Sequence, residues 1–413
     1  MFERRIDKYW NFETSDTKEF THCYHMYPAM MIPQVARKLI ADYKPVHCNL
    51  LLDPYMGSGT SLVEANIVGI NAIGTDINPL ARLMSKVKTT HYDLSEISYW
   101  YSEICMAFGF YSPTDVKDTN FERISNYAFW YSEDSLYRLT FITQLINDRV
   151  PKEYQDFFRV ALSETVREVS FTRNGEFKRY RMRQDRIDVF KPDVFKNFEM
   201  KVIRNMKGLM AFNKYENGAN SMICDFNSTF EIPNDIIADG SLDMVVTSPP
   251  YGDSHTTVAY GQFSRWANEW FGFANAKNLD NLLMGGQKSK DCKFSTESIK
   301  PELEEIKVLD PKRYREVLSF LDDYYFSIMN VAKKVRKGGR ICYVVGNRRV
   351  KNVQINLDYF TAETFERFGF KHEITIVRDI PNKRMPAKNS PSNVVGEKVA
   401  TMSNEFMVIM TKQ

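Results

Sequence analysis

The order of apolar patterns along the chain predicts an α/β fold with a mostly parallel twisted sheet, a C-terminal antiparallel hairpin and a mostly helical insertion. Strand and helix patterns alternate in residues 46–90 and return after residue 220, which is typical of a parallel sheet with crossover helices. Long helical patterns replace this alternation in residues 91–219, and two β-rich runs close the chain.

The first half of the sheet is predicted from the patterns around two turns. An apolar strand ends within residues 46–54, glycines follow at 57 and 59, and helical spacing runs from Thr60 to Gly69. Residues 70–77 form a second strand pattern. The next helix opens at Asn78, which can cap it, and at Pro79, which suits a first helical turn.

The remaining elements follow the same logic. Residues 154–171 carry apolar side chains every three to four positions, which predicts a long helix inside the insertion. Strand patterns occupy residues 221–226 and 242–248, and a second insertion of mixed charge lies near 278–310. Further along we expect a helix at 311–335, a strand at 338–347, a helix at 362–370 and the hairpin strands 371–379 and 404–412.

Composition limits the class of protein. A chain of 413 residues with 43% hydrophobic residues can bury a large core, in two domains or in one domain with insertions. No apolar run approaches the roughly 20 residues that cross a bilayer, and the charged, aromatic start lacks the apolar centre of a signal peptide. We therefore expect a cytoplasmic protein with no membrane partner. The six cysteines are scattered without a CxxC pair, which predicts reduced thiols rather than disulfides or a zinc ribbon.

The net charge of +3 is too small to indicate nucleic-acid binding, but the distribution of charge is uneven. Residues 167–186 contain seven basic and three acidic side chains. Within this segment the candidate DNA-contacting residues are Arg173, Lys178, Arg179, Arg181 and Arg183. The alternative is a solvated charged face without a partner.

A glycine-rich turn, DPYMGSGT at Asp53 to Thr60, joins the first strand to its helix. Such a turn exposes backbone amides at a helix N-terminus and lets a ligand approach closely, although it can also be a tight structural turn. Asp76 ends the next strand, where nucleotide-binding α/β folds hold a ribose. The glycine-rich turn and the Asp76 carboxylate together predict an adenosine-containing cofactor at the carboxyl ends of the strands.

A second motif, VVTSPPYGDS at Val245 to Ser254, places a hydroxyl, two prolines and a phenol at the tip of a strand. Combined with DPYMGSGT, the TSPPY segment resembles the amino-methylating DNA methyltransferases that use S-adenosylmethionine. The segment HMYPAM, beginning at His25, resembles the cofactor-enclosing segment of the same family. Segments near YVVGNR and IVRDIPNKRMPAKNSPSN resemble late-chain parts of the cytosine-N4 branch, the second being a loop near the target base.

The resemblance implies a Rossmann-like methyltransferase fold and a set of site residues. Ser248 Oγ and the Pro249 carbonyl would accept hydrogen bonds from the target amine, Pro250 would keep the segment rigid, and Tyr251 would stack on a flipped base. The residues implied to bind S-adenosyl-L-methionine are Tyr27, Pro28, Asp53, Tyr55, Gly57, Ser58, Gly59, Thr60, Asp76 and Asp225. Neither a metal nor a covalent enzyme intermediate is needed for this chemistry.

The serine in TSPPY favours cytosine N4 as the methylated atom, because the adenine-N6 branch typically has Asp or Asn there. Adenine N6 stays open as an alternative, as do an RNA guanine-N2 methyltransferase and a catalytically silent nucleic-acid-binding protein. No cysteine follows a proline, which argues against methylation of cytosine at ring carbon 5. His255 is either a base-pocket or a loop residue, and His22 with His25 lacks the partners of a metal site.

The expected organisation follows from these motifs. Residues 1–90 form the N-terminal cofactor-binding part, 91–219 the candidate DNA-recognition region, and 220–413 the remainder of the catalytic domain with the target-base pocket. The expected role is protection of duplex DNA in a restriction-modification system, with a separately encoded restriction endonuclease as partner. The recognition sequence and the oligomeric state do not follow from the sequence.

Overall fold

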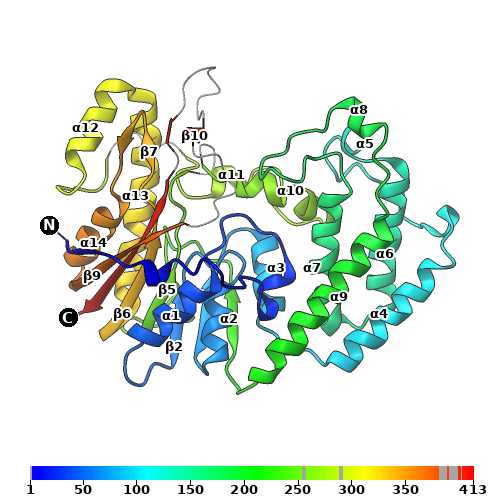
Figure 1. Cartoon of the computed structure of the whole chain (residues 1–413), viewed down its shortest axis with the longest axis horizontal. Coiled ribbons are helices and arrows are strands. Elements are labelled where there is room, and N and C mark those ends of the chain that lie inside the picture. Colours follow the sequence, from blue (N-terminus) through cyan, green and yellow to red (C-terminus); the bar gives the residue numbers. More distant parts are fainter. Residues whose placement is uncertain (1, 254–256, 288–291, 381–387, 390–398, 401) are drawn as a thin grey trace.

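The computed structural model describes residues 2–413 except 254–256, 288–291, 381–387, 390–398 and 401. His255 and most of the loop predicted to lie near the target base fall outside the described residues. Figure 1 shows a sheet with helices against both faces and, beside it, a lobe made almost entirely of helices.

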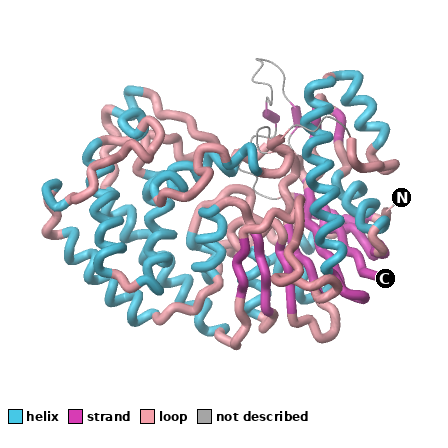
Figure 2. The backbone as a smooth tube through the Cα atoms, turned by 180° about the vertical axis from the view of Figure 1, so that it is seen from behind, coloured by secondary structure: helices cyan, strands magenta, loops and turns pink. Residues whose placement is uncertain are grey.

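Eight strands of the described chain form the main sheet, which Figure 2 shows from behind. Its order is β1 (Arg4–Ile6), β9 (Phe370–Asp379), β12 (Asn404–Lys412), β6 (Val335–Val345), β5 (Leu242–Thr247), β2 (Leu50–Asp53), β3 (Asn71–Thr75) and β4 (Ser221–Cys224). β12 runs antiparallel to both of its neighbours, whereas the other neighbouring strands are parallel. The predicted α/β fold with a C-terminal antiparallel hairpin is therefore confirmed.

Alternate residues of each strand enter different cores because side chains of a strand point to opposite faces. Leu52, Val245 and Ile341 pack with α13 (Pro311–Lys334) and α14 (Leu357–Arg367). Leu51 and Met244 face the other way, toward α1 (Pro33–Tyr43) and α2 (Thr60–Ile67). A helix layer on each face explains why the central strands are apolar on both sides.

Three differences from the expected elements have local causes. The N-terminal residues of β1 pair with β9, although three residues are too few to give a strand pattern. β6 begins at Val335, directly after α13, and runs through Gly338, whose φ is +72°. The second insertion contributes two helices, the short α11 (Leu279–Leu282) and α12 (Lys300–Leu309).

The described chain also forms two small two-stranded sheets. One pairs β7 (Arg349–Val350) with β8 (Val353–Gln354), and the other pairs β10 (Lys388–Asn389) with β11 (Val399–Ala400).

Residues 91–219 are mostly helical, as predicted. The helices are α4 (Leu94–Phe108), α5 (Tyr127–Trp130), α6 (Glu133–Arg149), α7 (Lys152–Glu168), α8 (Gln184–Ile187) and α9 (Val194–Phe212), with 3₁₀ turns at Pro113–Asp115 and Asn213–Tyr215. Their core also takes in α3 (Pro79–Lys88) and α10 (Tyr260–Trp270), which contributes Phe263, Trp266 and Trp270. The helical lobe is thus completed by a segment from the later part of the chain.

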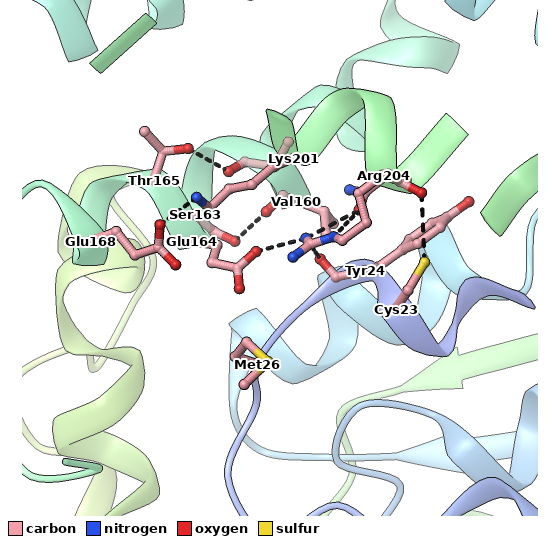
Figure 3. Close-up of polar contacts among 12 residues, drawn as sticks. Cys23, Tyr24, Met26, Val160, Ser163, Glu164, Thr165, Glu168, Lys201 and Arg204 are labelled. Atoms are coloured by element: carbon pink, nitrogen blue, oxygen red, sulfur yellow. Dashed lines mark hydrogen bonds and ion pairs between the residues drawn. The ribbon is translucent and has the colours of Figure 1, made fainter. Parts of the chain in front are cut away.

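The helical lobe is tied to the N-terminal segment through Arg204 on α9 (Figure 3). Its guanidinium donates at 2.6 Å to Glu164 Oε2 on α7 and at 2.6 Å to the carbonyl of Tyr24. Tyr24 ends the 3₁₀ turn Phe20–Tyr24; the other such turn near the N-terminus is Lys8–Trp10. Glu164 is buried, so Arg204 neutralises a charge that water does not reach.

No helix within the described ranges has the length and apolar character needed to span a membrane.

Replacing Arg204 with Ala leaves the buried Glu164 carboxylate without its cation. We expect the free energy of unfolding to fall by about 3 kcal/mol or more, because an uncompensated buried charge is costly. Lys117→Ala is the control, since Lys117 pairs with Asp148 at 3.3 Å on the surface and should contribute at most about 1 kcal/mol. Urea unfolding measures both, and equal effects of the two variants would contradict the assignment.

Candidate active site

The glycine turn between β2 and α2 has two residues that need a left-handed backbone. Gly57 has φ +49° and Gly59 has φ +79°, a region where glycine carries no steric penalty. At Gly59 an added Cβ would also lie 3.1 Å from Ser85 Cα on α3. The Gly57 carbonyl accepts a hydrogen bond from Ser85 Oγ at 2.9 Å, so the turn is packed directly against α3.

Asp76 stands beside this turn, at the end of β3. Its carboxylate accepts hydrogen bonds from the amide of Gly57 at 3.1 Å and from the amide of Asn78 at 2.8 Å. Burial raises the pKa of Asp76 to about 6, with the two amide donors acting in the opposite direction. The carboxylate is therefore held in a fixed position at the carboxyl end of the sheet.

Asp53 connects the glycine turn with the TSPPY segment. Thr247 Oγ1 on β5 donates to Asp53 Oδ1 at 2.6 Å, the Tyr55 amide donates to the same oxygen at 3.1 Å, and Ser61 Oγ on α2 donates to Oδ2. Burial raises the pKa of Asp53 to about 6, while these donors oppose the shift. Three groups from three elements thus converge on one carboxylate.

A pocket opens between these elements and encloses about 920 Å³, counted together with its mouth. The predicted residues that line it are Tyr27, Pro28, Asp53, Tyr55, Gly57, Ser58, Thr60, Asp76, Ser248 and Pro250. The structure therefore brings the glycine turn, the acidic strand end and two residues of the TSPPY segment, Ser248 and Pro250, to one cavity, whereas Tyr251 is not among the lining residues.

The segment before α1 forms one wall of the pocket. Tyr27 stacks on Tyr260 of α10 with ring centroids 5.9 Å apart, and its hydroxyl accepts a hydrogen bond from Asn78 Nδ2 at 2.9 Å. Ala29, which also lines the pocket, has φ +52°. A left-handed backbone at a residue with a Cβ is strained, and such strain concentrates at ligand sites.

The TSPPY segment continues β5 into the pocket wall. Pro249 is buried and does not line the pocket, whereas Ser248 lines it with its hydroxyl 3.1 Å from the Tyr251 hydroxyl. The Tyr251 ring packs against Gly346, where an added Cβ would lie 2.6 Å from Cδ2 of the ring. The absence of a side chain at Gly346 is therefore needed for the position of Tyr251.

Searches for similar proteins gave one decisive match. The type II methyltransferase M.MvaI of Kocuria varians is 38% identical over 426 residues, covering 98% of this chain and 94% of that protein. The chain belongs to the type II methyltransferases. The type II methyltransferase M.BsoBI of Geobacillus stearothermophilus is 23% identical over 429 residues, covering 90% of this chain and 82% of that relative.

No protein-family model matches this methyltransferase. Among solved structures, a TehB-like SAM-dependent methyltransferase from Corynebacterium glutamicum aligns with a TM-score of 0.30 and 10% identity, over 92% of this chain and 87% of that one. At that score the alignment adds nothing to the sheet order described above.

The pocket has the chemistry to hold S-adenosylmethionine, the cofactor implied by the resemblance of the DPYMGSGT and TSPPY motifs. Asp76 offers acceptors for ribose hydroxyls, the glycine turn leaves room for close approach, and Tyr55, Phe226 and Tyr260 offer rings. When bound, S-adenosylmethionine supplies a methyl group attached to a positively charged sulfur.

Some predicted residues of the methyltransferase lie elsewhere. Gly59 does not line the pocket and packs against α3, and Asp225 is exposed and borders a different cavity. The pocket is lined instead by the residues that follow it, from Phe226 to Thr229. These residues come directly after a parallel strand, and in α/β folds ligands bind at the carboxyl ends of such strands, so the sequence could have indicated their place in the pocket. No sequence pattern indicated that Tyr260 on α10 lines the pocket.

The basic segment, residues 167–186, contains both solvent-accessible basic side chains and basic side chains that contact aromatic rings of the helical lobe. Arg173 and Arg183 are exposed, and Lys178 is half-buried. Arg179 lies over the ring of Trp266, with 4.7 Å from Cζ to the ring centroid, and burial lowers its pKa. Arg181 lies 4.3 Å over Phe129 and donates to the Phe129 carbonyl at 2.9 Å. The last two guanidinium groups therefore already have partners within the helical lobe.

Gly346→Ala tests the packing of Tyr251. The new methyl group would overlap the Tyr251 ring and Met402, and a displacement of about 1 Å in an active site can reduce a rate by about a hundredfold. We expect a loss of methyl transfer to DNA of at least about tenfold, measured with labelled S-adenosylmethionine. Gly109→Ala, at a helix end with φ −66°, is the control. An unchanged rate for Gly346→Ala would show that Tyr251 does not need its present position.

Proposed function

We propose that this chain transfers a methyl group from S-adenosylmethionine to the exocyclic N4 amine of a flipped-out cytosine, in a specific sequence of duplex DNA. The observation that carries the proposal is the shared cavity: Ser248 and Pro250 line the same pocket as Gly57 and Asp76. A base amine held at Ser248 would face a cofactor held by the glycine turn. Methyl transfer requires this proximity of donor and acceptor.

The roles of the target-base residues follow from the chemistry of an aromatic amine. Its nitrogen is a poor nucleophile because the lone pair is delocalised into the ring. Ser248 Oγ and the Pro249 carbonyl accept hydrogen bonds from its two hydrogens and favour a more tetrahedral nitrogen, whose lone pair then points at the methyl group. Pro250 fixes the backbone, and Tyr251 provides a face for the extruded base.

The cofactor residues divide into three groups. Tyr27, Pro28, Gly57, Ser58 and Thr60 hold the methionine part, supported by Gly59 in the same turn. Asp76 binds the ribose hydroxyls, and Tyr55 presents an aromatic edge to the cofactor. Asp53 supports the wall that these residues form, and Asp225 stays a proposed neighbour of the adenine. The lining of the pocket supports most of these assignments.

Cytosine is proposed over adenine because the first residue of the motif is a neutral serine. Its hydroxyl accepts a hydrogen bond without adding a negative charge to the pocket. Asp53 and Asp76 already bring two carboxyl groups to the cavity. A third would increase repulsion between like charges in a buried site.

Duplex DNA is proposed to contact the helical lobe, residues 91–219 with α10. Arg173, Lys178 and Arg183 are available to neutralise phosphates, whereas Arg179 and Arg181 shape the same surface through their aromatic contacts. The biological role is protection of host DNA, with a separately encoded restriction endonuclease recognising the same sequence.

The function is tested by incubating the purified protein with labelled S-adenosylmethionine and unmethylated bacterial DNA, followed by hydrolysis to nucleosides. We expect label in N4-methylcytosine. Label in N6-methyladenine would contradict the cytosine assignment, and label in transfer RNA but not in DNA would contradict the DNA assignment. Loss of transfer in Ser248→Ala, with an unchanged thermal midpoint, ties the activity to this site.

Affinity for S-adenosylmethionine is expected to depend on pH through Asp76, whose pKa burial raises to about 6. The ionised carboxylate accepts hydrogen bonds from ribose hydroxyls, and protonation as the pH falls through 6 removes part of that capacity. Calorimetric titration should therefore give a dissociation constant about tenfold higher at pH 5 than at pH 7.5. Asp76→Asn should bind weakly at both values. The same pH dependence in Asp76→Asn would assign the titration to another group, such as Asp53.

A further inference from the structure

The Tyr251 hydroxyl is one member of a hydrogen-bonded row that leads away from the pocket. It lies 3.1 Å from Ser248 Oγ on one side and donates to Glu405 Oε1 at 3.2 Å on the other. Glu405 is on β12, the last strand of the chain. Beyond it, Arg378 Nε of β9 donates to Glu405 Oε2 at 2.8 Å.

The far end of the row is rigid. Glu405 and Arg378 are direct cross-strand partners in the antiparallel pair of β12 and β9. The Arg378 side chain is only 4% exposed, and it also donates to the carbonyls of Trp10 at 3.1 Å and Asn11 at 3.3 Å. A buried guanidinium with three acceptors leaves Glu405 Oε2 occupied and Oε1 directed at Tyr251.

The row has a definite direction. Glu405, paired with Arg378, is an acceptor, so the single hydrogen of the Tyr251 hydroxyl points to it. Burial, and then the nearby Glu405 carboxylate, raise the pKa of Tyr251 well above its usual value, so the phenol keeps this hydrogen. In the contact between Ser248 and Tyr251 the serine must therefore be the donor, with the tyrosine oxygen as acceptor.

We infer that Glu405 is a positioning residue for methyl transfer: acting through Tyr251, it draws the Ser248 hydrogen away from the pocket and presents the serine lone pairs to the target amine. This inference rests on the proposed function, in which Ser248 accepts a hydrogen bond from that amine. If Tyr251 had no acceptor at Glu405, its hydrogen could turn to Ser248. The serine hydroxyl would then be free to point its own hydrogen into the pocket, against an amine that can only donate.

The test is a double-mutant cycle with Tyr251→Phe and Glu405→Gln, followed by single-turnover methyl transfer to DNA. Tyr251→Phe keeps the ring and the ion pair of Glu405 with Arg378, and removes only the hydroxyl. Each single variant should lower the rate constant about tenfold, the value of one net hydrogen bond. The double variant should be no slower than either single variant, because both break the same row.

Three further measurements separate positioning from folding. Dissociation constants for S-adenosylmethionine and DNA should stay within about twofold of the wild type, within the scatter of independent sites. Fluorescence of 2-aminopurine at the mapped target position should show unchanged base flipping. Glu373→Gln, an exposed residue of β9, is the control and should retain the wild-type rate. If Glu405→Gln does not fold, Tyr251→Phe alone carries the test.

The outcomes distinguish the inference from the function. A wild-type protein that transfers no methyl group to DNA would overturn both. If the wild-type protein is active and either Tyr251→Phe or Glu405→Gln retains the full rate constant, the inference alone is overturned. The same holds if the losses of the two single variants multiply in the double variant. A shared tenfold loss with unchanged dissociation constants and unchanged flipping would establish Glu405 as a positioning residue.

Discussion

The rest of the site depends on the buried carboxylate of Asp53. It accepts hydrogen bonds from Thr247 at the end of β5, from the Tyr55 amide in the glycine turn and from Ser61 in the first turn of α2. Burying a carboxylate is costly unless its oxygens are satisfied, and here both are. The strand that leads to Ser248 and the turn that leads to Gly57 are consequently fixed to each other through this one carboxylate. Thr247, which donates to it, directly precedes Ser248.

Two other contacts extend this arrangement to the edges of the pocket. Asp76 binds the amide of Gly57 from the neighbouring strand, and Tyr27 reaches Asn78 at the start of α3. Opposite them, Tyr251 lies between Gly346 and Glu405, which belong to the antiparallel side of the sheet. The glycine turn and Asp76 are thus fixed by neighbouring parallel strands, whereas Tyr251 is held from β12, the strand that runs antiparallel to both of its neighbours.

Sequence patterns predicted the sheet, the helical insertion and the two main motifs, because each depends on residues close together in the chain. They did not predict contacts between distant segments. Arg378 and Glu405 become partners only when β9 and β12 pair, and Tyr260 reaches Tyr27 only when α10 crosses to the pocket. Asp225 illustrates the limit of a pattern: the strand predicted at residues 221–226 ends at Cys224, Asp225 is exposed, and the residues from Phe226 line the cavity. Register at a strand end is decided by tertiary packing, which a local pattern does not contain.

The shared core of the helical lobe restricts how such an enzyme can be re-engineered. Exchange of residues 91–219 for the corresponding region of another enzyme would not transplant a complete module. Phe263, Trp266 and Trp270 of α10 belong to that core, and the Tyr260 at the start of the same helix lines the pocket. A chimaera joined only at the ends of the insertion would therefore cut through one hydrophobic core, and its boundaries must include α10 or be matched to it.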